Sequence, residues 1–317
     1  MSSNVACKIC QHATILYQAN LADDRYSYPG TFSIYRCPAC GFGQLQSLIV
    51  KDQLEDLYTN YYPRKVITTA SVRAGAQAHG SWLLGNPDIY GQFARPGLRM
   101  LDIGCGDGAS LLMMQAKGAE AYGTELDRNV MTPAKELGLT IHIGDIETAP
   151  YPDHSFDVIT LSQLLEHVEN PIQFLHQVKR KLKPGGKIVI TTPRFGGLQQ
   201  RMSGRCWINW HIPFHVNFFS RTSLLQLARL SGLRVMRMKT FTPHTWVTLQ
   251  LLNLKQPNRY WHPRPTGVTL GQYLRQLGVF QSSHLLLAHA FGWLSIPYYR
   301  LLDAVRGGDS WFIVLTV

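Results

Sequence analysis

Acidic residues are scarce in the C-terminal part of this 317-residue chain. From Arg194 onward there are 14 Lys or Arg and only two acids, Asp303 and Asp309, a net charge of +12. Up to Pro193 the counts are 17 and 18, a net charge of −1, so the total of +11 comes from the C-terminal part. Six of the seven tryptophans lie there too. This asymmetry leaves two interpretations: a solvated basic face, or a site for an acidic partner such as a phosphate, a nucleic acid or an anionic membrane surface.

Long apolar runs are also missing. No stretch of about 20 uncharged apolar residues occurs, so we expect no membrane span. The opening residues "MSSNVACKIC" contain no apolar signal region, so we expect no secretion. The sequence therefore predicts a cytoplasmic protein, either free or peripheral at the inner membrane face.

Cysteine is limited to six residues, and four of them form two CxxC pairs. In an intracellular protein such pairs favour metal binding over disulfides. Two pairs separated by 26 residues can supply four thiolates to one tetrahedral site, and four cysteines leave no open coordination position. We therefore expect one structural Zn²⁺; the alternative is four unliganded buried thiols. The expected metal ligands are Cys7, Cys10, Cys37 and Cys40.

Glycine, by contrast, is concentrated in "LDIGCGDG", residues 101–108. The preceding "LRMLDI" is typical of a buried strand, and the following "ASLLMMQAKG" has apolar residues at helical spacing and ends at Gly118. A second strand, "AEAYGTELD", comes next. The pattern predicts a βαβ unit whose glycine turn lies at the carboxyl end of a parallel sheet, where such sheets bind ligands.

Charge distinguishes the possible nucleotides. Asp102 directly precedes the glycines, where it would repel a pyrophosphate but attract the cationic S-adenosylmethionine. Glu125, at the end of the second strand, is placed to accept hydrogen bonds from both ribose hydroxyls. A short strand in "LTIHIGDIE" is expected to end in Asp145, which suits the adenine amino group, with Ile146 beside the ring. The alternative is that Asp102 and Glu125 only cap neighbouring elements.

Later segments continue the alternation of strands and helices. Strands are expected over Phe156–Leu161 and in "KIVITTP", "RVMRMKTF" and "SWFIVLTV". One helix is expected in "IQFLHQVKRKLKPGG", closed by Pro184-Gly185-Gly186, and another in "SRTSLLQLARLSGL". About seven strands with helices between them predict a doubly wound α/β domain.

These motifs, with "LLEHVENP" and "KLKPGG", resemble the class I S-adenosylmethionine-dependent methyltransferases, in particular the ubiquinone-type and small-molecule branch. "YRCPACGFGQL" is similar to half of a zinc ribbon, a module that precedes methyltransferases of bacterial surface-polysaccharide or natural-product assembly. The resemblance implies a seven-stranded, Rossmann-like domain with a small N-terminal zinc ribbon and a C-terminal helical insertion. The implied division is a zinc module at 1–60, a connecting or lid segment at 61–96, and a methyltransferase domain at 97–317 with insertions at 194–219 and 242–309. The implied cofactor contacts are Asp102, Gly104, Cys105, Gly106, Gly108, Glu125, Leu126, Asp145, Ile146 and Leu161.

Three histidines are candidates for a general base that would take the hydroxyl proton in an O-methyl transfer. They are His167, in "EHVENP", and the pair His215 and His211. Pro213 separates that pair, so we expect no regular helix there, and a metal site at the pair is weakly supported. The alternatives are structural histidines, and catalysis by proximity without any base.

The function this predicts is methyl transfer to a small molecule, most simply to an oxygen of a surface glycan, lipid-linked sugar or secondary metabolite. The basic C-terminal part favours an acidic or amphiphilic acceptor. The apolar residues 284–305 suggest either a packed helical pair or an interfacial patch or substrate tunnel. Alternatives are an RNA base methyltransferase, although "LSQL" stands where an NPPY-like tetrapeptide would be, a protein methyltransferase, and a non-catalytic cofactor-binding scaffold.

Overall fold

The computed structural model describes residues 5–23, 28–46, 66–78, 85, 88–255, 290 and 292–317. They form two compact units, each assembled from segments that are far apart in the sequence. The first unit comprises residues 1–66, 193–224 and 242–309, and the second comprises residues 67–192, 225–241 and 310–317. Within the expected connecting segment, residues 61–96, the parts 61–65, 79–84 and 86–87 lie outside the described residues.

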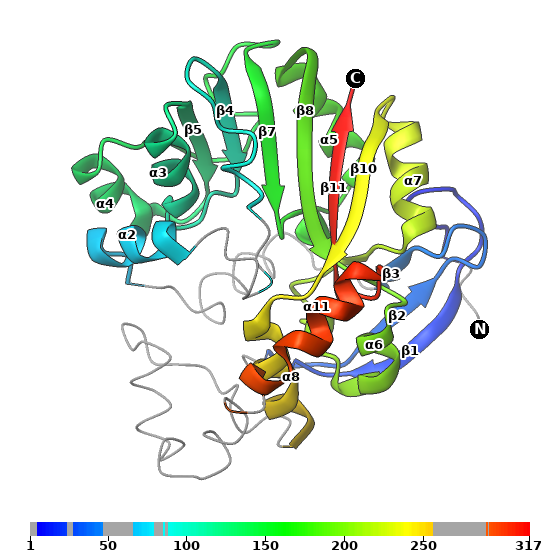
Figure 1. Ribbon diagram of the computed structural model, residues 1–317. Coiled ribbons are helices and arrows are strands. Elements are labelled where there is room, and N and C mark those ends of the chain that lie inside the picture. Colours follow the sequence, from blue (N-terminus) through cyan, green and yellow to red (C-terminus); the bar gives the residue numbers. More distant parts are fainter. Residues whose placement is uncertain are drawn as a thin grey trace. The chain divides into compact units, whose positions relative to one another are not determined.

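The second unit is built on a seven-stranded sheet of order β10-β11-β8-β7-β4-β5-β6 (Figure 1). Parallel pairing joins β8, β7, β4, β5 and β6, while β10 and β11 are antiparallel. Successive strands run outward from β4 in both directions, so β4 and β7 flank the topological switch point, where open α/β sheets bind ligands. The expected α/β class and strand number are confirmed. The strands are β4 (Arg99–Ile103), β5 (Glu120–Glu125), β6 (Thr140–Ile143), β7 (Phe156–Ser162), β8 (Leu182–Pro193), β10 (Arg234–Phe241) and β11 (Ser310–Thr316).

Helices flank this sheet. In Figure 1, α2, α3 and α4 gather beside β5, while α5 lies behind β8 and β11. α5 begins as its sequence predicts, because Asn170 accepts a hydrogen bond from the backbone N–H of Gln173 and Pro171 takes the first helical position. The helices are α2 (Thr69–Ala78), α3 (Ala109–Ala116), α4 (Met131–Glu136), α5 (Pro171–Lys181) and α7 (Arg221–Leu230), with short 3₁₀ turns at Arg128–Val130 and Leu165–His167.

Two predicted boundaries are corrected. The helix expected to run to Pro184-Gly185-Gly186 ends at Lys181, and Leu182 already pairs with Phe156 of β7. The cause is local, because a residue that precedes proline disfavours the helical conformation. Likewise, β6 ends at Ile143, so Asp145 lies in the loop after the strand.

Gly123 in β5 is required by packing. A Cβ at this position would lie 2.7 Å from Cys105 Sγ and 2.9 Å from Leu111 Cδ1. Gly123→Ala is therefore expected to lower the free energy of unfolding by about 1–3 kcal/mol, the usual cost of overpacking. Denaturant unfolding measures the loss. Adding Cys105→Ala should restore part of it, whereas equal losses in both variants would contradict the steric explanation.

The first unit contains a four-stranded antiparallel sheet of order β1-β2-β3-β9. Its fourth strand comes from the insertion at 194–219, because Gly43 pairs with Phe218. A core that includes Ile34, Trp207 and Trp210 covers this sheet. The strands are β1 (Ile15–Leu21), β2 (Phe32–Arg36), β3 (Gly43–Leu45) and β9 (Asn217–Phe218). The helices are α6 (Leu198–Ser203), α8 (His244–Lys255) and α11 (Ile296–Ala304), with 3₁₀ turns at Gly204–Cys206 and Ile208–Trp210.

A buried carboxylate joins the two insertions within this unit. Asp309, 2% exposed, accepts hydrogen bonds from Trp207 Nε1 and from Asn209 Nδ2 at 2.9 Å. Its backbone carbonyl accepts from the N–H of Arg194 at 2.8 Å. The other acid of the C-terminal part, Asp303, pairs with Arg300 at 3.1 Å. Both acids thus serve internal contacts.

No helix within the described residues is long and apolar enough to cross a membrane. Residues 284–289 and 291 of the apolar C-terminal segment lie outside the described residues. Within the remainder, the Leu294, Leu301 and Val305 side chains are more than half exposed. The packed helical pair considered for this segment therefore does not bury these three side chains.

Candidate functional site

The glycine turn follows β4 at the switch point of the second unit's sheet. Gly104, Gly106 and Gly108 have φ angles of +71°, +58° and +84°, a region that side chains with a Cβ rarely adopt. A Cβ built on Gly106 would have no atom of the described residues within 4 Å, and Gly106 is exposed, so this part of the turn borders open space. The backbone there is accessible to a ligand.

Asp102 lies beneath the turn, near the carboxyl end of β4. Its carboxylate is 1% exposed and accepts hydrogen bonds of 2.5 Å from both Ser110 Oγ and Thr160 Oγ1. Burial raises the pKa of Asp102 to about 7, although the hydrogen bonds from the two hydroxyl groups oppose the shift. A cation bound nearby would favour the ionised form.

This pKa gives a pH prediction. Because the pKa of Asp102 is higher in the folded protein than its ordinary value of 3.8, folded stability from this group is present at low pH and is lost as pH rises toward about 7. Asp102→Asn removes this titrating group, so the free energy of unfolding should fall less steeply with pH, by up to about 1.4 kcal/mol per pH unit. Denaturant unfolding of the apoprotein between pH 5.5 and 7 measures the slope, and identical slopes would contradict the buried titration.

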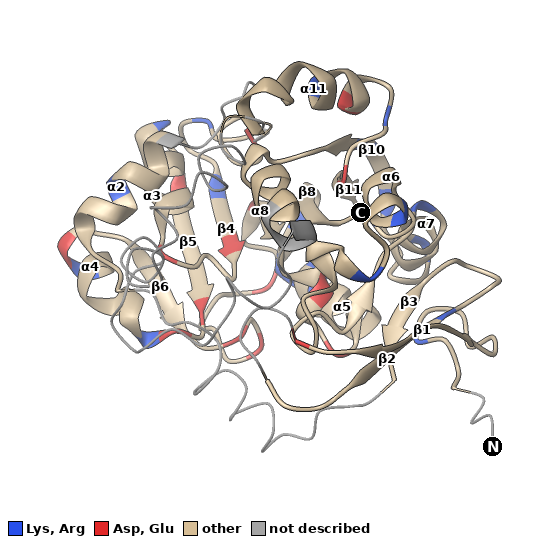
Figure 2. Ribbon diagram, turned by 90° about the horizontal axis from the view of Figure 1, so that it is seen from below, with Lys and Arg blue, Asp and Glu red and all other residues tan. Residues whose placement is uncertain are grey.

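Glu125 closes the turn from the end of β5 (Figure 2, where the acidic positions of β4 and β5 are red). Its Oε2 accepts from the N–H of Gly106 at 2.8 Å. Its Oε1 accepts from the N–H groups of Leu126 at 2.7 Å and Asp127 at 2.9 Å. The structure thus brings Glu125 onto the same turn as Asp102, whose pKa its charge helps to raise.

Asp145 lies one loop further on. The N–H of Gly144 donates to the Glu125 carbonyl at 2.9 Å, which holds the two loops together. Asp145 Oδ1 accepts from both the N–H and the hydroxyl of Thr148, and the backbone hydrogen bond lowers the pKa of Asp145. The neighbouring predicted positions differ in exposure: Ile146, Cys105 and Leu161 are buried, whereas Leu126 is 75% exposed.

Two further residues beside this site were not anticipated from the sequence. Tyr90 is buried, and burial together with the charge of Asp102 raises its pKa, opposed by a hydrogen bond with Ser162. Glu166 is 1% exposed; its Oε2 accepts from Thr192 Oγ1 at 2.9 Å, while its Oε1 has no hydrogen-bond partner among the described residues. Burial raises the pKa of Glu166 to about 8. The sequence signal that could have found Glu166 is its position as an acid within "LLEHVENP".

The three candidate histidines differ in burial. His167 is half-buried at the end of a 3₁₀ turn after β7. His211 and His215 are buried, with Nδ1 of the first 3.3 Å from Nε2 of the second. His215 Nδ1 lies 2.9 Å from the Asn209 carbonyl, and the pair is not in a regular helix. The pair therefore has internal polar contacts in the first unit.

The four predicted cysteine ligands converge in the first unit. All four sulfurs lie within 4.8 Å of one another. Cys7 and Cys40 have sulfurs 3.6 Å apart, and those of Cys10 and Cys37 are 3.3 Å apart. These separations are too long for disulfides, and tetrahedral zinc with Zn–S bonds of about 2.3 Å sets sulfur separations near 3.8 Å. The donor set and its spacing fit a Zn²⁺ ion.

The second CxxC pair is held by its own turn and by residues that follow the first insertion. The N–H of Gly41 donates to the Cys37 carbonyl at 2.9 Å, and the φ of +71° at Gly41 permits this turn. The Cys40 carbonyl accepts from Ser220 Oγ at 3.1 Å and from Thr222 Oγ1 at 2.6 Å. The cysteine cluster thus depends on residues far away in the sequence.

Comparison with known proteins identifies the family. A family model described as a methyltransferase domain matches residues 83–237. A ubiquinone biosynthesis O-methyltransferase of Cereibacter sphaeroides is 31% identical over 173 residues, which are 50% of this chain and 70% of that protein. The chain belongs to the S-adenosylmethionine-dependent methyltransferases.

Other similarities to this methyltransferase are more limited. An uncharacterized 37.1 kDa protein in transposon TN4556 of Streptomyces fradiae is 31% identical over 113 residues, 33% of each chain. A solved S-adenosylmethionine-dependent methyltransferase of Thermotoga maritima is 16% identical with a TM-score of 0.46, over 83% of this chain and 98% of that one.

Proposed function

We propose that this methyltransferase transfers the methyl group of S-adenosylmethionine to a hydroxyl oxygen of a small, acidic or amphiphilic molecule. The observation that carries the proposal is the set of three carboxylates, Asp102, Glu125 and Asp145, around a glycine turn that borders open space. The similarity to a ubiquinone biosynthesis O-methyltransferase supports oxygen as the accepting atom.

The residues of the turn fit the cofactor chemically. Asp102 and the backbone of Gly104–Gly108 would hold the methionine part, which is cationic and carries no phosphate. Glu125 would exchange its hydrogen bond from the Gly106 N–H for hydrogen bonds from the ribose hydroxyls. Asp145 and Ile146 would hold the adenine, and Cys105, Leu126 and Leu161 would line the cofactor site.

When bound, S-adenosylmethionine supplies a methyl group on an electrophilic sulfonium. The chain must then orient the acceptor and provide a place for the hydroxyl proton. His167 is our first candidate for that base, because it is half-buried beside the switch point, whereas His211 and His215 are buried and have polar contacts with each other. A catalyst that only orients the acceptor remains the alternative.

The charge of the C-terminal part supports an acidic group on the acceptor. This part of the chain contains 14 basic residues and only two acidic ones. Asp309 is buried among Trp207 and Asn209, and Asp303 is paired with Arg300. Neither acid therefore neutralises the exposed arginines, which would attract an anionic acceptor by long-range electrostatics.

We further propose that the cysteine cluster holds one structural Zn²⁺. Four sulfurs would complete its coordination, so no position remains for a reacting water. The role of the ion would be to hold β1, β2 and β3 together.

Methyl-labelled S-adenosylmethionine tests the function. The purified protein is incubated with extract of its host, and lipids, small polar molecules, RNA and protein are then separated. Label in lipids or small molecules, stable to conditions that cleave methyl esters, is expected. Label in RNA or protein would replace the proposal with one of those acceptor classes, and label on nitrogen would refute the O-methyl assignment. Cofactor binding without transfer to any fraction would favour a scaffold.

A further inference from the structure

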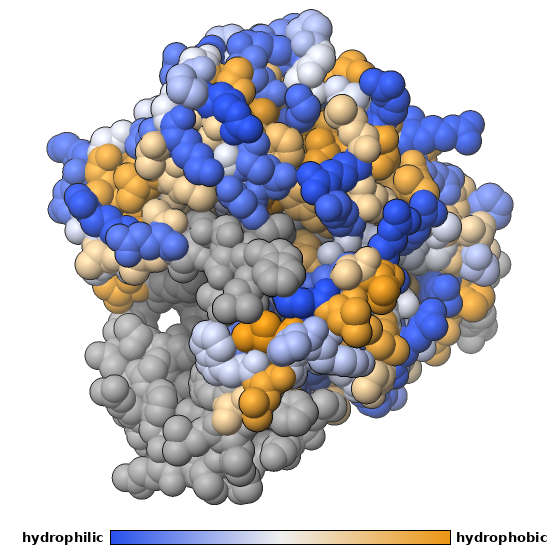
Figure 3. Space-filling view, viewed as in Figure 1, coloured by the Kyte–Doolittle hydropathy of each residue, from blue (hydrophilic) through white to orange (hydrophobic). Residues whose placement is uncertain are grey.

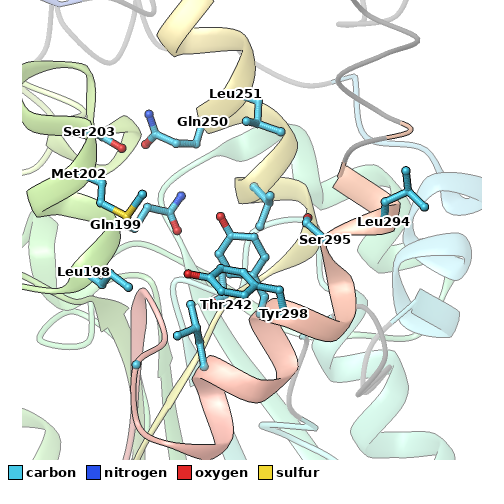
Figure 4. Close-up of a pocket in the computed structure, with 14 residues that line it drawn as sticks. Leu198, Gln199, Met202, Ser203, Thr242, Gln250, Leu251, Leu294, Ser295 and Tyr298 are labelled. Carbon is cyan, nitrogen blue, oxygen red and sulfur yellow. The ribbon is translucent and has the colours of Figure 1, made fainter.

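The first unit contains a cavity of about 480 Å³ that the methyl-transfer chemistry does not use (Figure 4). It lies between α6, α8 and α11, and its volume falls in the range of about 300–1,000 Å³ typical of small-molecule sites. Leu198, Gln199 and Met202 reach it from α6, and Gln250 and Leu251 from α8. The other lining residues are Ser203, Thr242, Val247, Leu294, Ser295, Tyr298, Tyr299, Leu302 and Gly307.

The chemistry of the wall defines what can enter. None of the described lining residues is charged, in contrast to the basic character of the C-terminal part as a whole. An ionised ligand group would lose its hydration there without gaining a counter-charge, which is costly. The cavity therefore selects an uncharged, predominantly apolar group.

One polar side chain in the wall, Gln199, makes no side-chain hydrogen bond with the described residues. Both the Nε2 and the Oε1 of Gln199 are buried and have no hydrogen-bond partner among the described residues. Two other polar wall groups have partners: the Gln250 amide accepts from the Ile208 N–H and donates to the Cys206 carbonyl, and Ser295 donates to the Gly292 carbonyl. Native proteins rarely leave a buried amide unsatisfied, so Gln199 matches a ligand group that both donates and accepts.

The cavity opens beside apolar surface. Met202 and Leu294 both line it and are 75% and 79% exposed, and Tyr298 is 52% exposed. Figure 3 shows apolar side chains at the surface over α8 and α11. An apolar ligand could therefore enter along these exposed apolar side chains.

We propose that this cavity binds the chain of a lipid-like alcohol: an uncharged, apolar, isoprenoid- or alkyl-type chain whose hydroxyl group hydrogen-bonds with Gln199. The identification of this ligand with part of the methyl acceptor rests on the proposed function; the binding site itself does not.

Equilibrium dialysis with tritiated farnesol, without S-adenosylmethionine, tests the site. We expect saturable binding of one farnesol per chain, and binding of farnesoic acid at least 10-fold weaker at pH 8, where the acid is ionised. Gln199→Leu should weaken farnesol binding by about 3- to 10-fold, the value of one neutral hydrogen bond. No saturable binding, or equal affinity for the acid, would overturn the proposal.

Two cavity-filling variants locate the site. Leu302→Trp from α11 and Leu251→Trp from α8 should each abolish farnesol binding, so that misfolding of one leaves the other informative. Met236→Trp, at an exposed position of β10, is the matched control and should bind normally. Unchanged binding in both cavity variants would refute the location. Because the assay contains no cofactor, failure of methyl transfer to any acceptor leaves its outcome unaffected.

Discussion

Replacing Glu125 with alanine is expected to weaken S-adenosylmethionine binding by about 10- to 100-fold. Hydrogen bonds to charged groups contribute about 1.5–3 kcal/mol, and 1.4 kcal/mol corresponds to a factor of 10. Here the carboxylate accepts hydrogen bonds from the N–H groups of Gly106, Leu126 and Asp127, so it orders the turn in addition to its proposed contact with the ribose. Isothermal titration of the purified protein measures the dissociation constant.

The matched control for this variant is Glu120→Ala. Glu120 begins the same strand, is 57% exposed in its side chain, and pairs with Arg99 at 3.4 Å, a surface ion pair of little energetic value. The Glu120→Ala variant should therefore bind the cofactor as tightly as the unaltered protein. Glu125→Gln removes the charge and keeps only one of the two acceptor oxygens that hold the turn. A dissociation constant unchanged in Glu125→Ala would remove Glu125 from the cofactor site.

The second large effect is expected for Cys40→Ala. Structural zinc contributes about 10–16 kcal/mol in zinc-finger peptides at pH 7, as much as the whole stability of a typical domain. The hydrophobic core that includes Ile34 is small, so by itself it contributes little to the stability of β1–β3. The variant should contain no zinc and should lose amide exchange protection in these strands. Elemental analysis and hydrogen exchange by mass spectrometry measure both.

Cys206→Ala is the control for zinc loss. Cys206 is half-buried, reduced, and outside the four-sulfur cluster, so its replacement should leave one zinc per chain and full protection of β1–β3. Removing zinc from the unaltered protein with a chelator should reproduce the Cys40→Ala pattern. Protection that survives both treatments would show that the sheet folds without the metal.

The seven-stranded sheet is predictable because its signals are local. Apolar runs such as "RMLDI", glycines at forced φ angles and the acids that end strands each report on a few neighbouring residues. Parallel βαβ topology then brings the carboxyl ends of β4 and β5 together, so the order of residues along the chain is enough to assign Asp102 and Glu125 to one turn. The positions of these side chains follow from secondary structure alone.

The features that sequence reasoning missed depend on distant pairing. Nothing near Asn217 indicates that this two-residue strand completes an N-terminal sheet, and the partners of the Cys40 carbonyl lie at 220 and 222. The burial of Tyr90 against Asp102 and Ser162 likewise involves three separate segments. In the sequence, His211 and His215 are candidates for a general base because histidine titrates near neutrality. Their buried mutual contact is visible only in the structure.

The discontinuous make-up of the two units has a consequence for biosynthesis. β3 leaves the ribosome early, but Gly43 can pair with Phe218 only after that residue has been synthesised. The delay is about 10–35 s at roughly 5–20 residues per second. During that time the edge of β3 is unpaired and can associate with other nascent chains. The second unit closes later still, when Ser310–Thr316 pairs with β10. Early capture of zinc by the cysteines of residues 7–40 would shield the waiting sheet, so metal supply during translation, rather than after it, should govern the yield of native protein.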